Sequence, residues 1–511
     1  MTNPLELYEV IQRVGYFIQI HKQREDHRYW HFDFRPKDLI SCLQINKTWR
    51  QALTPLLWRV YNEEEMMKLE VPPELYQANS QYFWYLELHS PWPADTLKPT
   101  QLRQLVIRGQ ALKASLGLLQ SNRLLSLLDV SLYDNTSYSD VQKSFDYVTW
   151  LKILRFHSGA SLDPDHFASF IFNNRELTEL LVSSIDGFET LEQHEPMMHL
   201  TTLQLDVLLG NNPGLVQLIR FCPNLEVFWF EGYADCPFEA VATNLRECCP
   251  KVSSIRCLNT FSIISPDEVL WDNELIALIN SSRRLTHFEM PIFDLTPRST
   301  LALLTPHWST LQLLRLDLHG FNGKDNLVNA GNILACCINL HKFVLHNENR
   351  NWLPADCLGL LRRPWLCKRL SAFTMTGIWF EAQADVDDSA EPFEKDPDDP
   401  NDVEPTMVVS QGFLGMASST DLAHSTKNLA DLSEFVPKKM LGRNGWEVHD
   451  KSPVDISEAL SSKCGNRLVR EILERTISLA NIRKVTVNGY LYAKAGSPEL
   501  RRAKALRKEQ E

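Results

Sequence analysis

The sequence predicts an α/β fold in which short parallel strands alternate with helices in a stacked solenoid. An apolar phrase recurs along most of the chain: one apolar residue, two spacers, a second apolar residue, one spacer and a third apolar residue. It returns about every 26 residues, and a period of this size is typical of repeat proteins. Segments of helical periodicity separate the copies. Repeat arrays present a long surface to partners, so the pattern favours binding over catalysis.

Each copy of the phrase predicts one strand. In the copy that begins at Leu311, Leu314 and Leu316 alternate with Arg315 and Asp317. This alternation places the leucines on one face of a strand and the charged side chains on the other. One such strand cannot bury its apolar face alone, whereas stacked copies cover one another. The copies begin at Leu102, Leu125, Leu151, Leu177, Leu200, Leu225, Val252, Leu285, Leu311, Leu340, Leu370 and Ile482.

Amphipathic segments between the phrases predict helices. Residues 213–221, 238–245 and 273–279 carry apolar side chains at three- and four-residue steps. Such steps mark one face of a helix. Pro223 and Pro250 follow the first two segments, and a proline there ends the helix before the next extended run.

The first sixty residues follow a different pattern. Apolar residues at helical steps predict a first helix, and they are Leu7, Val10, Ile11, Val14 and Ile18. A polar, aromatic-rich insertion covers residues 21–35. A second helical module begins at Asp38, which is a favourable N-cap residue. Its apolar face consists of Leu39, Cys42, Leu43, Trp49 and Leu53.

These patterns divide the chain into segments. Residues 1–60 form a helical domain, 61–82 a linker with a short helix, and 83–381 the solenoid, whose first strand is a degenerate copy at 83–88. Residues 382–425 are acidic and broken by prolines, so we expect disorder because too little apolar surface offsets the entropy of ordering. Residues 426–495 form a terminal repeat that caps the array, and 496–511 form a charged tail.

Composition and charge exclude several classes of function. The formal net charge is −12, and the stretch from Asp385 to Glu404 holds ten acidic residues and one lysine, a net of −9 that leaves −3 for the rest. A nucleic-acid-binding surface is basic, so we expect no nucleic-acid partner. No apolar run approaches the ~20 residues of a membrane span, and no signal-peptide pattern is present. The cysteines form no C-x-x-C pair, which indicates a reduced cytoplasmic or nuclear protein without membrane contact.

No motif for metal binding or catalysis is present. His194 and His199 are five residues apart, whereas a zinc-binding pair on a helix needs a spacing of four. Asp396, Asp398 and Asp402 lack the glycine of a calcium loop. Nucleophile-elbow, phosphate-binding and dinucleotide motifs are also missing. We therefore expect no cofactor, no metal and no enzymatic activity of the chain's own.

The N-terminal segment resembles an F-box, and most of the remaining chain resembles leucine-rich repeats. The F-box landmarks lie in residues 7–11, 38–39, 45–50 and 57–58, where Tyr8 and Asn46 replace the family's usual proline and cysteine. Fungal-type proteins of this kind are substrate receptors of Skp–cullin–F-box ubiquitin ligases. The resemblance implies that the F-box docks on the Skp-type adaptor of the cullin ligase core. It also implies that the repeats form a curved horseshoe, with strands lining its inside, that captures the protein to be ubiquitinated.

The resemblance also implies an adaptor-binding set. These residues are Leu7, Val10, Ile11, Val14, Asp38, Leu39, Leu43, Ile45, Trp49, Arg50, Leu57 and Trp58. A short helical unit with apolar residues on more than one face cannot bury them all by itself, so it needs a partner.

If the strands line the inside of a horseshoe, their spacers face solvent in parallel columns. One column contains Val106, Asp129, Arg155, Leu181, Gln204, Trp229, Arg256, Glu289, Arg315, Val344 and Thr374. Exposed tryptophan and arginine dominate binding hot spots, so we expect Trp229 and Arg256 to anchor a substrate protein. The full set of substrate-binding candidates is Gln204, Asp206, Trp229, Glu231, Arg256, Arg315 and Asp317.

Two other functions remain open. The chain can be a leucine-rich-repeat interaction scaffold without a ubiquitin role, in which residues 1–60 only cap the first repeat. A GTPase-activating repeat protein would need a catalytic loop arginine, and none stands out. Capture of a Skp-type adaptor separates the ligase receptor from the scaffold.

Overall fold

The computed structural model describes most of the chain between residues 7 and 494. The described residues are 7–18, 21–25, 30–34, 36–91, 96–132, 145–158, 164–182, 194–205, 208–209, 213–230, 233–234, 238–257, 271–320, 323–347, 357–377, 446–449, 472, 475, 479, 484–487 and 490–494. The acidic insertion, most of the terminal repeat predicted at 426–495 and the charged tail lie outside them. The chain divides into two compact units, residues 1–291 and 292–511. Among the described residues, no helix combines the length and apolarity that a membrane crossing requires.

The first unit is α/β, with helices on one face of a parallel sheet, as the sequence predicts. Its strands pair in the order in which they occur in the chain, apart from β10 and β12, which form a small pair of their own. The strands of the sheet are β3 (Val60–Asn62), β4 (Tyr85–Leu88), β5 (Gln104–Arg108), β6 (Leu127–Leu132), β7 (Ile153–Ser158), β8 (Glu179–Val182), β9 (Thr202–Leu205), β11 (Val227–Phe230), β13 (Ser254–Cys257) and β14 (His287–Ile292). The small pair is β10 (Leu208–Leu209) with β12 (Tyr233–Ala234).

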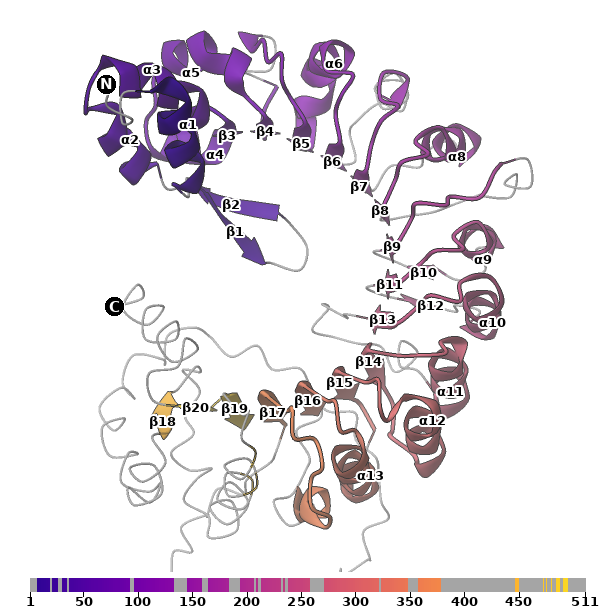
Figure 1. Cartoon of the computed structure of the whole chain (residues 1–511). Coiled ribbons are helices and arrows are strands. Elements are labelled where there is room, and N and C mark those ends of the chain that lie inside the picture. Colours follow the sequence, from indigo (N-terminus) through magenta and orange to yellow (C-terminus); the bar gives the residue numbers. More distant parts are fainter. Residues whose placement is uncertain are drawn as a thin grey trace, which may run out of the picture. The chain divides into compact units, whose positions relative to one another are not determined.

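Helices connect these strands and lie along one face of the sheet (Figure 1). The N-terminal helices are α1 (Tyr8–Phe17), α2 (Lys37–Leu43), α3 (Lys47–Leu57), α4 (Glu63–Lys68) and α5 (Pro73–Asn79). The helices between strands are α6 (Leu112–Ser121), α8 (Pro164–Asn173), α9 (Pro213–Arg220), α10 (Phe238–Cys248) and α11 (Asp272–Ser281). Short 3₁₀ turns occur at Ser80–Tyr82 and Gly109–Ala111. The helices predicted at 213–221, 238–245 and 273–279 are thereby confirmed.

The second unit continues the same construction. Parallel strands β15 (Leu313–Leu318), β16 (Lys342–Asn347), β17 (Ala372–Thr376) and β19 (Lys484–Val487) pair in that order. Helix α12 (Pro297–His307) precedes β15, helix α13 (Gly323–Cys336) connects β15 to β16, and the 3₁₀ turn Leu358–Leu361 lies between β16 and β17. Two antiparallel strands, β20 (Tyr490–Lys494) and β18 (Trp446–His449), follow β19 at the sheet edge.

Every copy of the apolar phrase precedes a strand by two residues. Leu125, Leu177 and Leu225, for example, begin phrases whose strands start at Leu127, Glu179 and Val227. In these three copies the first apolar residue lies in the turn, where its N–H donates to the carbonyl three residues earlier. The second and third apolar residues then form the buried face of the strand. The strands predicted from the phrase are thereby confirmed.

The core lies between the strands and the helices of each unit. In the first unit the central apolar row of the sheet is fully buried, and it comprises Leu86, Leu105, Leu128, Leu154, Leu180, Leu203, Phe228, Ile255 and Phe288. The Phe156 ring of β7 lies 5.4 Å from Phe167 of α8, and the Phe230 ring of β11 lies 5.8 Å from Phe238 of α10. In the second unit Leu314, Phe343, Phe373 and Val485 form the corresponding row.

Asparagine side chains close several turns between a helix and the next strand. Asn174 is buried, its Oδ1 accepts from Leu151 N at 3.0 Å, and its Nδ2 donates to the carbonyls of Val148 and Phe170 at 3.1 and 2.9 Å. Asn122 makes a similar link to Leu102 N at 3.3 Å. These amides therefore tie one repeat to the backbone of the preceding one.

Three local features differ from the expectations. The parallel sheet begins at β3, which straddles the boundary between the helical domain and the linker, one strand before β4, the strand that confirms the prediction at 83–88. The insertion at 21–35 contains an antiparallel hairpin, β1 (His21–Glu25) with β2 (Trp30–Phe34). The prediction of Asp38 as an N-cap is wrong: helix α2 begins at Lys37, so Asp38 lies in its first turn. Asn46 caps helix α3 instead, because its Oδ1 accepts from Trp49 N at 2.9 Å.

Candidate protein-interaction surfaces

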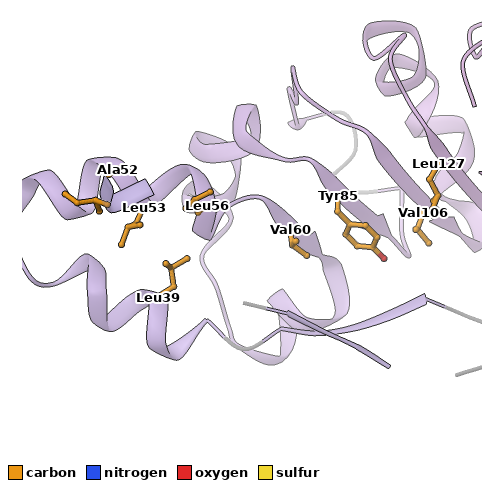
Figure 2. Close-up of a cluster of buried hydrophobic side chains, with 9 residues drawn as sticks. Leu39, Ala52, Leu53, Leu56, Val60, Tyr85, Val106 and Leu127 are labelled. Carbon is orange, nitrogen blue, oxygen red and sulfur yellow. The ribbon is translucent and has the colours of Figure 1, made fainter. Parts of the chain in front are cut away.

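Helices α1, α2 and α3 form a small helical module in the first unit, in which α3 packs against both α1 and α2. Its core is filled by Ile11, Leu39, Ala52, Leu53 and Leu56. Figure 2 shows that this cluster continues from the helices through Val60 and Tyr85 to Val106 and Leu127 on the first strands. The module is therefore anchored to the beginning of the sheet by one continuous apolar cluster.

Gly15 allows α1 and α3 to approach closely. A Cβ atom at this position would overlap the side chains of Leu53 and Leu56. Glycine thus lets the ends of these two leucine side chains lie against α1, although it lowers helix propensity.

A second apolar stripe of α1 faces away from this core. Leu7, Val10, Val14 and Phe17, which we call the α1 stripe, are 43%, 37%, 39% and 84% exposed. Ile45, in the turn between α2 and α3, is also exposed. Since these residues contribute little to the module's own core, the α1 stripe is a surface that a partner can cover.

The structure separates the predicted adaptor-binding residues into three groups. Leu7, Val10, Val14, Asp38, Ile45 and Arg50 are exposed, and Leu43, Trp49, Leu57 and Trp58 are half-buried. Ile11 and Leu39 are 1% and 0% exposed. These two were expected to contact the adaptor, but they belong to the internal core because they fill the space between the helices.

The strand spacers align in register, as the sequence predicts. Within the first unit, pairing joins Arg155 to Leu181, Leu181 to Gln204, Gln204 to Trp229, and Trp229 to Arg256. In the second unit Arg315 pairs with Val344. The prediction that the whole column faces solvent is wrong. Five of its members are buried in the structure, namely Val106, Asp129, Leu181, Gln204 and Glu289.

Several charged side chains at the spacer positions of the strands form ion pairs with one another. Arg108 donates to Asp129 Oδ1 at 2.5 Å and to Ser131 Oγ at 2.7 Å. Arg155 donates to Glu179 Oε1 at 2.5 Å. Pairing of this kind lets adjacent parallel strands carry buried charge.

The substrate-binding candidates of the first unit are partly covered. Gln204 is 5% exposed, and Trp229 is half-buried with its Nε1–H buried and donating to no described acceptor. Arg256 Nε donates to Ser254 Oγ at 3.0 Å and lies 3.4 Å from Glu289 Oε1. Asp206 and Glu231 lie outside the described residues. Trp229 and Arg256 are therefore the members of this set that retain accessible surface.

In the second unit, Arg315 and Asp317 form an ion pair. Arg315 Nε lies 3.1 Å from Asp317 Oδ2. Asp317 is 5% exposed, whereas the Arg315 side chain is 37% exposed. Arg315 is thus the accessible partner, and Asp317 acts by orienting it.

Histidine, cysteine and acidic side chains are the possible metal ligands, and cysteines the possible reactive thiols, in the described part of the chain. No group of three histidine, cysteine or acidic side chains is arranged to hold a metal ion among those residues. His194 stacks on Phe172 with ring centroids 4.4 Å apart. Burial raises the pKa of the Cys249 thiol to about 12, so the unreactive thiol form predominates at neutral pH.

Three residues without a sequence motif also come together in the first unit. The Arg59 guanidinium lies 4.6 Å from the centroid of the Trp84 ring and 5.7 Å from that of Tyr16. Tyr16 lies on α1 and Trp84 directly precedes β4, so only the packing of the helical module against the sheet brings them together.

Comparison with known proteins adds no identification. No family model matches the chain, and no curated protein is significantly similar to it.

Proposed function

We propose that this protein is the substrate-recognition subunit of a Skp–cullin–F-box ubiquitin ligase. The helical module docks on a Skp-type adaptor, and the strand-lined repeats bind the protein to be ubiquitinated. The chain itself is not an enzyme in this proposal, since conjugation is carried out by the partner enzymes. It works in the cytoplasm or the nucleus.

The observation that carries the proposal is the α1 stripe. The helical module fills its own core with Ile11, Leu39, Leu53 and Leu56, yet Val10, Val14 and Phe17 stay exposed on the neighbouring face of the same helix. A helix that only capped the first repeat would gain nothing from these exposed apolar side chains, because burial of apolar surface drives folding and association alike. Their position favours docking of a second protein.

Trp229 and Arg256 support the second half of the proposal. They lie side by side on adjacent strands β11 and β13, on the sheet face opposite the helices. Tryptophan and arginine are enriched in binding hot spots, because each combines a large contact area with hydrogen-bond donors. A folded protein or a peptide can reach this pair without opening the repeat core.

Co-purification with a Skp-type adaptor tests the proposal. We expect Val10→Glu with Val14→Glu to abolish capture, because it places two charges in the interface. Leu75→Glu is a suitable control, since Leu75 is exposed on α5 outside the α1 stripe. Trp49 and Leu43 are poorer targets, because both pack against the module's core and their loss would also destabilise it.

The opposite result would support the scaffold. If the folded, full-length protein captures no Skp-type adaptor, or if the Val10 and Val14 variant captures it as well as the Leu75 control, the ligase role fails. The repeats would then serve as an interaction scaffold whose helical module caps the sheet.

A further inference from the structure

A groove of about 870 Å³ lies within the first unit, between the helical module and the first repeats. One wall comes from α1 and the end of α3, with Gln12, Tyr16 and Arg59. The other comes from the segments before β4 and β5 and the turn after α6, with Trp84, Arg103 and Arg123. Its volume is within the range of sites that hold a ligand or a short peptide.

The charge of this groove is one-sided. Arg59, Arg103 and Arg123 line it, and none of the described lining residues is acidic. None of these arginines forms an ion pair with a described carboxylate, whereas Arg108 and Arg155 on the nearby strands do. Outside residues 385–404 the net charge is only −3, so three arginines without a described counter-charge give this groove a local positive charge.

Two of the arginines are held in place by neutral contacts. Arg59 is half-buried, and its guanidinium lies over the rings of Trp84 and Tyr16. Arg103 Nη1 donates to the carbonyl oxygen of Leu124 at 3.1 Å. These contacts orient the guanidinium groups and leave further N–H donors for an anionic ligand.

The groove is separate from the α1 stripe. Gln12 and Tyr16, which line the groove, are four residues apart and share one face of α1. Val14, in the α1 stripe, precedes Tyr16 by two residues, which is about 200° around the helix. Gln12 and Tyr16 therefore lie on a different face of α1 from Val14.

We propose that this groove binds a short, extended acidic segment of a partner protein. Aspartate and glutamate side chains of the segment pair with Arg59, Arg103 and Arg123, and its apolar side chains contact Leu124, which is 60% exposed at the rim. Gln12 and the neighbouring lining amides hydrogen-bond its backbone. This site goes beyond adaptor docking, and its test contains no adaptor, so either proposal can fail alone.

Charge and ring geometry favour a peptide over a nucleic acid. A nucleic-acid groove would stack bases on free aromatic faces. Here the Arg59 guanidinium covers one face of Trp84 and also lies over Tyr16. The three arginines are also few for a nucleic acid, because a nucleic-acid surface neutralises many phosphates.

Fluorescence anisotropy with the full chain tests the groove. The probe is a fluorescein-labelled peptide, Glu-Asp-Leu-Glu-Glu-Leu-Asp-Glu, and its amide counterpart, Gln-Asn-Leu-Gln-Gln-Leu-Asn-Gln, is the control peptide. We expect Arg103→Glu with Arg123→Glu to weaken binding about ten-fold or more, because attraction becomes repulsion at two sites. The matched control, Arg13→Glu with Lys113→Glu, changes the charge equally at exposed positions outside the groove lining and should bind as the unaltered chain does.

Several outcomes would overturn the proposal. They are an absence of peptide binding, equal binding of the amide peptide, and equal loss in both double variants. Tighter binding of a single-stranded oligonucleotide would assign the groove to nucleic acid instead. Binding that appears only after deletion of residues 385–404 would make the chain's own acidic stretch the occupant. Thermal melting of both double variants at the temperature of the unaltered chain excludes misfolding, since all four positions are exposed.

Discussion

The helical module and the repeats differ in how far their regularly spaced apolar side chains are buried. In the repeats, the apolar row of each strand is covered by its neighbours and by the helices, so Phe228 has no exposed surface. In the helical module, α1 carries one stripe that is buried and one that is exposed, and Phe17 is 84% exposed. Both regions have apolar residues at regular steps. The difference lies in what surrounds them.

This contrast explains why the two regions suit different tasks. A strand in a stacked array has a neighbour on each side, and the array therefore completes its own core. Helix α1 packs one face against α3, whereas its α1 stripe remains exposed among the described residues and is the surface that we propose for another protein. Substitutions of the same type in the two regions measure how far this contrast holds.

The largest expected effect comes from removing a phenylalanine in each region. Phe228→Ala should lower the free energy of unfolding by about 3–5 kcal/mol, because it leaves a cavity in the repeat core. Phe17→Ala should change it by less than about 0.5 kcal/mol, since the side chain is largely in water already. Urea denaturation of the two variants measures both values. Similar losses would mean that the α1 stripe is covered within the chain, which contradicts its proposed role.

An intermediate loss of stability is expected when a hydrogen-bonded asparagine is replaced by alanine. Asn174→Ala should cost about 2–4 kcal/mol, because it removes a buried amide and leaves Leu151 N and two carbonyls without their partner. Asn46→Ala should cost about 1 kcal/mol, which is typical of the loss of an exposed N-cap. Thermal unfolding compares them directly. A greater loss at Asn46 would show that the helical module, rather than the repeat turns, limits stability.

The smallest effect on stability is expected from the pair of Glu87 and His89 in the first unit. Glu87 on β4 is buried; burial by itself would raise its pKa, but hydrogen bonds from His89 and Tyr85 outweigh this and hold the pKa of Glu87 below its usual 4.5. The hydrogen bond with Glu87 holds the pKa of His89 above its usual 6.5. Ionised Glu87 therefore stabilises the folded state above pH 4.5, and this stabilisation is lost as the pH falls through its lowered pKa. Protonated His89 stabilises the folded state below pH 6.5, and this stabilisation is lost as the pH rises through its raised pKa.

The pair should therefore stabilise the protein most between pH 4.5 and 6.5. We expect its pH-dependent part to be below about 1 kcal/mol, because His89 is partly exposed and solvent screens it. Melting temperatures of the unaltered chain and of Glu87→Gln, measured from about pH 5.5 to about pH 8, test this. The gap between the two proteins should narrow as the pH rises. A gap that stays constant would show that the pair does not titrate in this range.

Much of the fold could be predicted because its signals are local. Alternation within five or six residues is enough to place the strand after Leu125 or Leu225, and the helices at 213–220 and 238–248 follow from steps of three and four. The start of α2 was misplaced by one residue or more, because an aspartate near a helix start suits either the cap or the first turn. The hairpin of β1 and β2 escaped prediction, since its alternation is weak among polar residues.

The candidate surfaces were predictable only in part. The register of Gln204, Trp229 and Arg256 followed from the repeat period, but the burial of Gln204 did not, since neighbouring side chains decide it. Ile11 and Val14 belong to the same periodic pattern, yet one fills the core and the other is exposed. A pattern of apolar residues gives the faces of a helix and does not say which face meets which neighbour.

By itself, the amino-acid sequence determined the repeating strand and helix units, because each depends on side chains a few positions apart. The tertiary structure alone decided which apolar stripe of α1 stays accessible and how Arg59, Arg103 and Arg123 meet in one groove without a described carboxylate. The arginines come from segments far apart in the chain, and only the packing of the helical module against the first strands brings them together.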